Sequence, residues 1–195
     1  MENTDIQLAR FDKGYLISWL ELFSNEPVSQ IECILLKGDA SDRNYYRVKY
    51  ALKSSPETQC SVIIMQLAKL ETEPDFNCIQ KFLKNLDIPV PEIFHFDAKK
   101  GLLFLMDFGD THLADKITKE PGKTVFWYQK AIYIIVALHI EATDNISPDL
   151  PAYSLFFDEE KLMWEMDFML EHYVLGMTMN NLTKVEISRF REALR

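Results

Sequence analysis

A short run of small residues between two apolar segments constrains the fold more than any other feature of the sequence. The segments are residues 31–36 and 45–50, whose composition is typical of β-strands, so the sequence predicts a β-hairpin. The run between them consists of Gly38, Asp39, Ala40 and Ser41. Small residues let backbone N–H groups approach a ligand, and the nearby Arg43 suits an anion such as phosphate. The alternative is an ordinary hairpin turn, because Gly, Asp and Ser favour turns for local reasons.

The remaining pattern predicts a strand-rich first part followed by helices. Ahead of the hairpin, near-helical spacing of apolar residues predicts an amphipathic helix at 5–24. After it we expect a strand at 61–68, a helix at 74–86 and two short strands around the turn at 99–101. The second of these strands, Gly101–Met106, is apolar without alternation and should be buried on both faces. From Thr124 onward the sequence predicts helices at 125–141, about 158–175 and about 183–195, the first of them buried, with a loop at 144–153.

Charge and composition exclude some classes of partner. The chain of 195 residues has 30 acidic and 21 basic residues and a net charge of −9, which argues against a nucleic-acid-binding surface. No apolar segment is long enough to span a bilayer, and the acidic N-terminus does not resemble a signal peptide. Cys33, Cys60 and Cys78 are widely spaced, and Cys33 and Cys60 fall in apolar strands, which predicts buried thiols in a reducing compartment. We therefore expect a cytoplasmic protein with no membrane partner.

Three motifs are similar to those of one kinase family. They are the loop Gly38–Val48, the phrase Val90–Ile93 before an expected strand, and the segment Gly101–Asp110. Together with the order hairpin, strand, helix, two strands and connector, they resemble the aminoglycoside phosphotransferase-like kinases. The resemblance is closest to the bacterial kinases of the cell-wall amino sugars N-acetylmuramate and N-acetylglucosamine, and it covers about residues 31–175.

This resemblance implies an α+β fold of the protein-kinase-like type. Residues 1–107 would form the small lobe, an antiparallel sheet plus a helix, and residues 108–195 the hinge and an incomplete helical large lobe. ATP would bind between the loop and the hinge, where backbone groups pair with the adenine edge; core packing is the alternative role for Met106 and Phe108. The residues assigned to nucleotide binding are Gly38, Asp39, Ala40, Ser41, Arg43, Met65, Leu105, Met106, Asp107 and Gly109.

The sequence departs from the kinase pattern in two respects. The third strand has no lysine for the α- and β-phosphates, and Gln66 stands where the resembling branch has an aspartate. The nearest match to a catalytic loop, His139–Asn145, has Glu141 in place of the aspartate, so we assign no catalytic residue in this chain. Asp107-Phe108-Gly109 spells the magnesium motif of protein kinases but precedes any candidate loop, so we assign no metal ligand here. The Mg²⁺ ligands are expected beyond residue 195, which implies the front part of a longer kinase.

The expected function is ATP-dependent phosphorylation of a sugar or amino-sugar hydroxyl, by a chain that lacks its catalytic loop. One alternative is a choline-, homoserine- or aminoglycoside-type small-molecule kinase, and another is a non-catalytic kinase-like remnant that binds nucleotide or protein. The expected partners are a nucleotide and a small-molecule substrate, with self-association through exposed helices of the large lobe. Glu165 and Asp167 either bind sugar hydroxyls or simply face water.

Overall fold

The computed structural model describes residues 10–36, 42–177 and 182–193. The chain divides into two compact units, Met1–Leu150 and Pro151–Arg195. The predicted hairpin tip, Gly38, Asp39, Ala40 and Ser41, lies outside the described residues. The predicted boundary between lobes after residue 107 stays a prediction.

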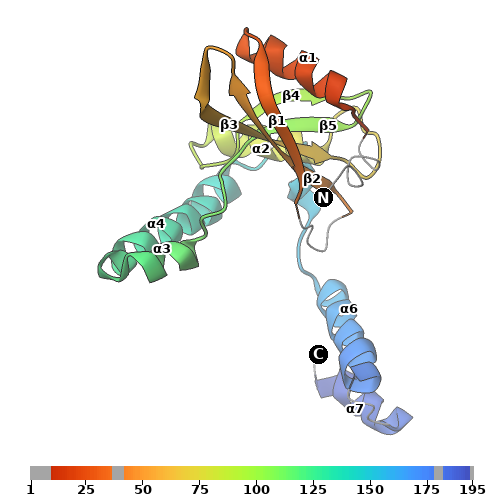
Figure 1. Ribbon diagram of the computed structural model, residues 1–195. Coiled ribbons are helices and arrows are strands. Elements are labelled where there is room, and N and C mark those ends of the chain that lie inside the picture. The colour runs from red at the N-terminus through yellow and green to blue at the C-terminus, as the bar shows by residue number, and fades with distance from the viewer. Residues whose placement is uncertain (1–9, 37–41, 178–181, 194–195) are drawn as a thin grey trace. The chain divides into compact units, whose positions relative to one another are not determined.

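The first unit contains a five-stranded antiparallel sheet with the strand order β1-β2-β3-β5-β4 (Figure 1). The strands are β1 (Val28–Leu35), β2 (Asn44–Leu52), β3 (Ser55–Gln66), β4 (Ile93–Asp97) and β5 (Leu102–Met106). The β-hairpin predicted from the two apolar segments is confirmed, since β1 and β2 pair from Val28 opposite Leu52 to Leu35 opposite Tyr46. The third strand begins at Ser55, well before the predicted start at residue 61, because its exposed first half still pairs with β2.

Helix α1 (Lys13–Ser24) covers one face of the sheet (Figure 1). The prediction of a helix from residue 5 is wrong for Arg10 to Asp12, because Asp12 is the N-cap and its side chain accepts a hydrogen bond from the Tyr15 N–H at 2.8 Å. The core on this face is formed by alternate residues of β2, β3 and β5 together with the buried side of α1. Its buried residues are Phe11, Leu16, Trp19, Leu20, Val28, Tyr46, Val48, Tyr50, Val62, Ile64, Leu102 and Phe104.

Helix α2 (Asp75–Asn85) begins close to the predicted residue and packs on the opposite face of the sheet. Its Phe76 joins a second cluster of buried residues, which consists of Met65, Leu67, Leu103 and Leu105. Strand β5 supplies residues to both clusters, and Leu102 to Leu105 are all buried. The prediction that this strand is buried on both faces is therefore confirmed up to Leu105, whereas its last residue, Met106, is exposed.

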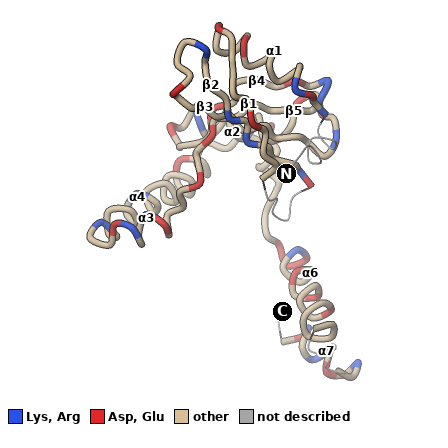
Figure 2. Tube along the Cα trace, viewed as in Figure 1, with Lys and Arg blue, Asp and Glu red and all other residues tan. Residues whose placement is uncertain are grey.

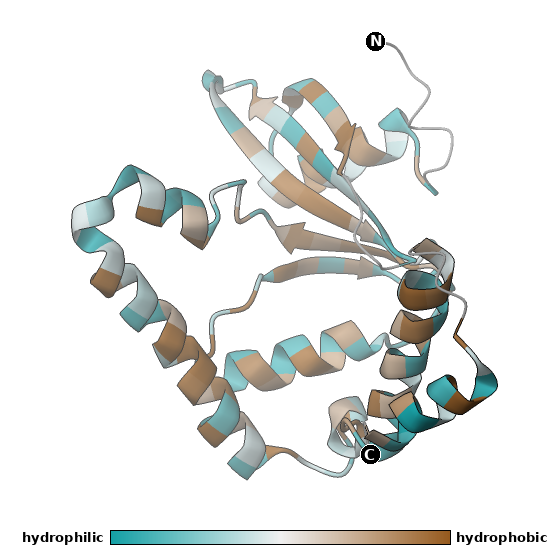
Figure 3. Ribbon diagram, turned by 90° about the horizontal axis from the view of Figure 1, so that it is seen from below, coloured by the Kyte–Doolittle hydropathy of each residue, from teal (hydrophilic) through white to brown (hydrophobic). Residues whose placement is uncertain are grey.

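The helices after β5 expose apolar side chains. They are α3 (Leu113–Lys119), which was not predicted, α4 (Thr124–Ala137) and the short α5 (Thr143–Asn145), with a π-helical segment at Leu138–Ala142. The predicted helix at 125–141 is thus present, but its α-helical part ends at Ala137. The prediction that it is buried is wrong, because α4 contains no buried residue. Figure 3 shows hydrophobic segments along this helix.

The second unit is helical, and an exposed ion pair joins two of its helices. It contains α6 (Glu159–Met169), a π-helical segment at Leu170–Met177 and α7 (Lys184–Ala193), which correspond to the two helices predicted there. Nε of Arg191 on α7 donates to Oδ1 of Asp167 on α6 at 2.6 Å. A 3-10 turn at Pro151–Ser154 precedes α6 and overlaps the end of the loop predicted at 144–153, whose first two residues belong instead to α5.

The cysteines and the helix lengths bear on two further predictions. Cys33, Cys60 and Cys78 are all free thiols, and each is only partly buried, so the prediction of burial for Cys33 and Cys60 is too strong. Burial still raises the pKa of Cys33 to about 11. In the part of the chain that the structure describes, no helix is both long enough and apolar enough to cross a membrane.

Candidate functional site

Strand β2 and the segment after β5 meet on the face of the sheet that carries α2. Arg47 pairs with Ile63 across β2 and β3, and Ile63 pairs with Leu105 across β3 and β5, so these three residues form one row. Asp107 follows Leu105 by two residues, which places it on the same side of the chain. Figure 2 shows acidic residues on the connection between β5 and α3. The register therefore brings a basic side chain of β2 to an acidic connection.

The guanidinium of Arg47 is shared by two carboxylates. Nε donates to Oδ2 of Asp107 at 2.7 Å, and Nη2 donates to Oδ1 of Asp107 at 3.0 Å. Nη1 donates to Oδ1 and Oδ2 of Asp110 at 2.7 Å and 2.6 Å. The side chains of Arg47 and Asp107 are 10% and 6% exposed, whereas that of Asp110 is 82% exposed. We call Arg47, Asp107 and Asp110 the arginine cluster. It contains a buried ion pair between Arg47 and Asp107 and a second ion pair from Arg47 to the exposed Asp110.

Hydrogen bonding keeps both buried groups of the arginine cluster charged. Burial raises the pKa of Asp107, but hydrogen bonds from Arg47, from the Gly109 N–H and from Ser61 outweigh that effect and hold the pKa below its ordinary value. The hydrogen bonds to Asp110 and then to Asp107 raise the pKa of Arg47. Both side chains are therefore ionised at neutral pH.

Local contacts order the backbone of the predicted hinge. Oδ1 of Asp107 accepts a hydrogen bond from the Gly109 N–H at 2.8 Å, and Gly109 has a φ of 73°, a conformation that favours glycine. The Met106 N–H donates to the Glu92 carbonyl at 2.9 Å. Two of the predicted adenine-binding donors thus have partners within the chain, and a ligand must use other backbone groups or displace these bonds. The assignment of this segment to adenine stays a prediction.

Met65, the site residue predicted on the third strand, is part of the hydrophobic core. Met65 is 0% exposed and belongs to the second core cluster, as does Leu105 of the hinge strand. The next residue, Gln66, is also buried, and its Oε1 accepts a hydrogen bond from the Arg10 N–H at 2.8 Å. Where the kinase pattern would place charged phosphate-binding groups, this strand has buried side chains with structural contacts.

Arg43 lies in a cavity that joins two of the sequence motifs. The cavity is about 360 Å³ in volume, between α2 and the connection to β4. Its lining consists of Arg43, Asp75, Phe76, Ile79, Gln80, Leu83, Val90 and Pro91. Nε2 of Gln80 donates to the Pro91 carbonyl at 2.9 Å, which fixes this connection against the helix. The structure thus brings the arginine after the hairpin loop to the Val90-Pro91 phrase, which are 47 residues apart in the sequence.

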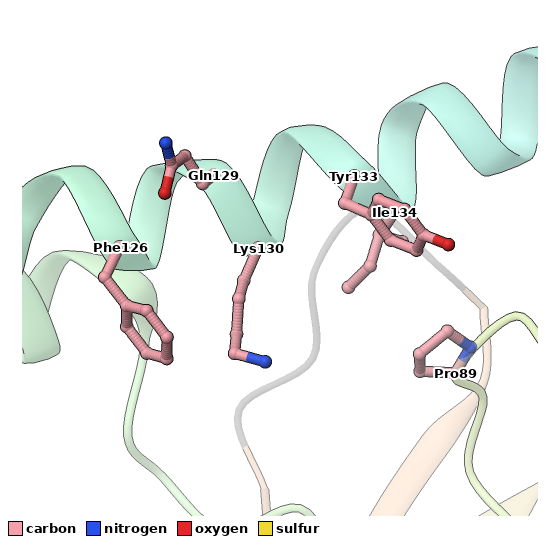
Figure 4. Close-up of a pocket in the computed structure, with 6 residues that line it drawn as sticks. All are labelled: Pro89, Phe126, Gln129, Lys130, Tyr133 and Ile134. Atoms are coloured by element: carbon pink, nitrogen blue, oxygen red, sulfur yellow. The ribbon is translucent and has the colours of Figure 1, made fainter.

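A second cavity of about 480 Å³ lies between α4 and the connection that follows α2. It is lined by Pro89, Phe126, Gln129, Lys130, Tyr133 and Ile134. Figure 4 shows Phe126 and Lys130 projecting from α4 toward the side on which Pro89 lies, while Gln129 points away. The sequence did not predict this cavity, because its walls belong to elements separated by more than one intervening strand.

Other candidate residues have mainly structural contacts. Asp167 is engaged by Arg191, and Glu165 lies 4.0 Å from Lys161 on the same helix, so their suggested contacts with sugar hydroxyls stay predictions. Among the residues that the structure describes, no group of three or more His, Cys, Asp or Glu side chains is arranged to hold a metal ion.

The arginine cluster is the feature that sequence reasoning missed. Its signal was an arginine at a strand position whose neighbours, Tyr46 and Val48, are apolar and face the core, together with two aspartates three residues apart after a buried strand. Neither half indicates a partner by itself.

No protein-family model matches this chain, and neither does any curated protein.

Proposed function

We propose that this chain binds ATP as the nucleotide-binding lobe of a kinase that phosphorylates a hydroxyl of a sugar or amino sugar. The observation that supports this most is the arrangement of the sheet. The chain forms a hairpin, a third strand, a helix and two further strands in that order, and the five strands make one antiparallel sheet in which β5 lies next to β3. This order agrees with the kinase-like small lobe implied by the sequence motifs.

The spacing of two arginines on the α2 side of the sheet also suits a nucleotide. Arg43 directly precedes β2 and Arg47 lies four residues further along, so at 3.3 Å per residue they are about 13 Å apart along the strand direction. Arg47 is beside the segment after β5, and Arg43 is next to the hairpin loop. An extended nucleoside triphosphate has a comparable length. The base would therefore lie near the hinge segment and the phosphates near Arg43.

The chemistry assigned to this part of the chain is binding. Arg43 would neutralise phosphate oxygens through a charged fork of N–H donors. The open space where a Cβ of Gly109 would lie, with no atom within 4 Å, leaves room for a base beside the hinge. ATP is used with Mg²⁺, which screens the phosphate charge when bound, but the described residues contain no cluster that fits the ion.

Calorimetric titration with ATP tests this proposal. The wild-type chain should bind ATP, and Arg43→Ala should weaken binding by about 1.5–3 kcal/mol, the range for hydrogen bonds to charged groups. The matched control is Lys53→Ala, which removes an exposed basic side chain from the turn at the opposite end of β2. No measurable ATP binding by the wild type would overturn the proposal. If Arg43→Ala binds ATP as tightly as the wild type does, the loop before Arg43 is an ordinary hairpin turn.

A second candidate function is nucleotide binding without phosphoryl transfer. One observation favours it: β3 contains no lysine, and its last two residues, Met65 and Gln66, are buried. A third-strand lysine normally contacts the α- and β-phosphates in this chemistry. Because no catalytic residue is assigned in this chain, the two functions are separated by an assay of ATP-dependent phosphorylation of N-acetylmuramate by the longer protein in which the catalytic loop is expected beyond residue 195. Product formation would favour the enzyme, and ATP binding without product would favour the non-catalytic module.

A further inference from the structure

The segment from Asp107 to Asp110 is hydrogen-bonded at both ends, through its two aspartate side chains, to the guanidinium of Arg47. Arg47 binds Asp107 through Nε and Nη2 and binds Asp110 through Nη1, so a single guanidinium closes a loop over four residues. Asp107 also accepts the Gly109 N–H inside that loop. The arginine cluster therefore sets where the backbone groups of this segment point.

Apolar packing contributes little to the order of this segment. Met106 is 43% exposed, and Phe108 is 66% exposed. Buried ion pairs are weak sources of net stability, because desolvation offsets much of the attraction, and apolar replacements of similar size are often equally stable. An arginine that donates hydrogen bonds to two carboxylates beside an otherwise exposed segment therefore fixes the conformation of that backbone more than it adds to stability.

We propose that Arg47 is a positioning residue that orders Asp107–Asp110 and thereby makes the site prefer adenine over guanine. This inference rests on the proposed function. Adenine and guanine differ in the donor and acceptor groups on the edge that faces a hinge backbone. A fixed backbone leaves groups unpaired against the wrong base, whereas a mobile one adapts to either, so discrimination requires the order that Arg47 supplies.

The decisive variant replaces the buried pair by apolar residues of similar size. Arg47→Met combined with Asp107→Leu removes the fork without leaving an unpaired buried charge, so the fold should persist. Arg47→Lys keeps the charge but lacks the planar fork, so it should not rescue the function of Arg47. The matched control is Lys49→Met, two residues further along the same face of β2, where the ion pair to Glu32 is 3.9 Å long and partly exposed.

Two readouts are measured on the full chain. The first is the ratio of the dissociation constants for GTP and ATP, and the second is amide hydrogen exchange of the segment Asp107–Asp110. In the wild type and Lys49→Met we expect ATP to bind at least about tenfold more tightly than GTP, which corresponds to about 1.4 kcal/mol. In the double variant and in Arg47→Lys we expect the ratio to fall toward one and exchange of the segment to quicken, with the melting temperature of the double variant nearly unchanged.

The failures of the two proposals are distinguishable. If the wild type binds neither nucleotide, the proposed function is overturned, and the role in base preference is overturned with it. If the wild type binds ATP and the double variant keeps both its base preference and its slow exchange, only the role of Arg47 is overturned. A wild type that binds ATP and GTP equally well also overturns that role.

Discussion

The most consequential side chain of the sheet is an arginine in an otherwise apolar setting. Arg47 is buried, yet two carboxylates satisfy its donors, which meets the general requirement that buried charges be paired and hydrogen-bonded. The two partners differ in environment, since Asp107 is buried and Asp110 is exposed. Loss of Asp107 should therefore affect stability far more than loss of Asp110.

Asp107→Asn should make the free energy of unfolding depend less on pH in the acidic range. Because the folded-state pKa of Asp107 lies below its ordinary value of 3.8, the contribution of Asp107 to stability is fully present above that value and is lost as pH falls through the folded-state pKa. At pH 7 the variant should be about 1–3 kcal/mol less stable, since it loses charged hydrogen bonds with Arg47. Urea unfolding at pH 7, 5 and 3 measures this.

The control for this prediction is Glu57→Gln, which changes an exposed carboxylate in the first half of β3. It should follow the wild type at every pH. An Asp107→Asn variant that loses stability in parallel with the wild type between pH 5 and pH 3 would contradict the prediction.

At the scale of elements, periodicity located most of the helices and strands, and tertiary contacts corrected their ends. The helix predicted at 125–141 becomes π-helical after Ala137, and the one predicted at 158–175 does so after Met169. Apolar spacing cannot distinguish these two hydrogen-bond patterns, because the residues involved favour helix in general. Helix α3 was missed because its seven residues, Leu113–Lys119, are too few for a periodic pattern.

Helix α1 should contribute to stability through one face alone. Leu20 is 0% exposed and packs against the sheet, whereas Leu22 on the same helix is 81% exposed. Leu20→Ala should therefore lower the free energy of unfolding by about 2–5 kcal/mol, which includes the cost of a cavity. Leu22→Ala should change it by less than about 0.5 kcal/mol. Urea denaturation of both variants measures the difference, and similar losses would mean that α1 does not cover the sheet in solution.

At the scale of the whole molecule, the exposed apolar side chains of α4 are the main unbalanced feature. Val125, Ile132, Tyr133 and Ile135 are each more than half exposed. A helix that is apolar around most of its circumference is normally buried. Exposed apolar patches of this kind promote association.

We therefore expect the purified chain to form dimers or larger species at about micromolar concentration. Ile132→Glu combined with Ile135→Glu should reduce the association, because burying the charged glutamates in an interface between chains is costly. Gln129→Glu, which adds a charge to a polar position of the same helix, is the control. Light scattering across a range of concentrations measures the mass. A wild-type chain that stays monomeric throughout would contradict the prediction.

Local sequence determined the α+β class, the hairpin and the buried fifth strand, because strand and helix periods depend on neighbouring residues. The face of α1 that meets the sheet was decided by the structure, in which Leu20 is buried and Leu22 is exposed. Tertiary structure decided the rest. Arg47 meets Asp107 and Asp110 across 60 and 63 residues, and Arg43 meets Pro91 in a cavity, through strand register and helix packing that no local pattern encodes. Register is set by the whole sheet closing around its two cores, so the candidate site emerged only when the strands were paired.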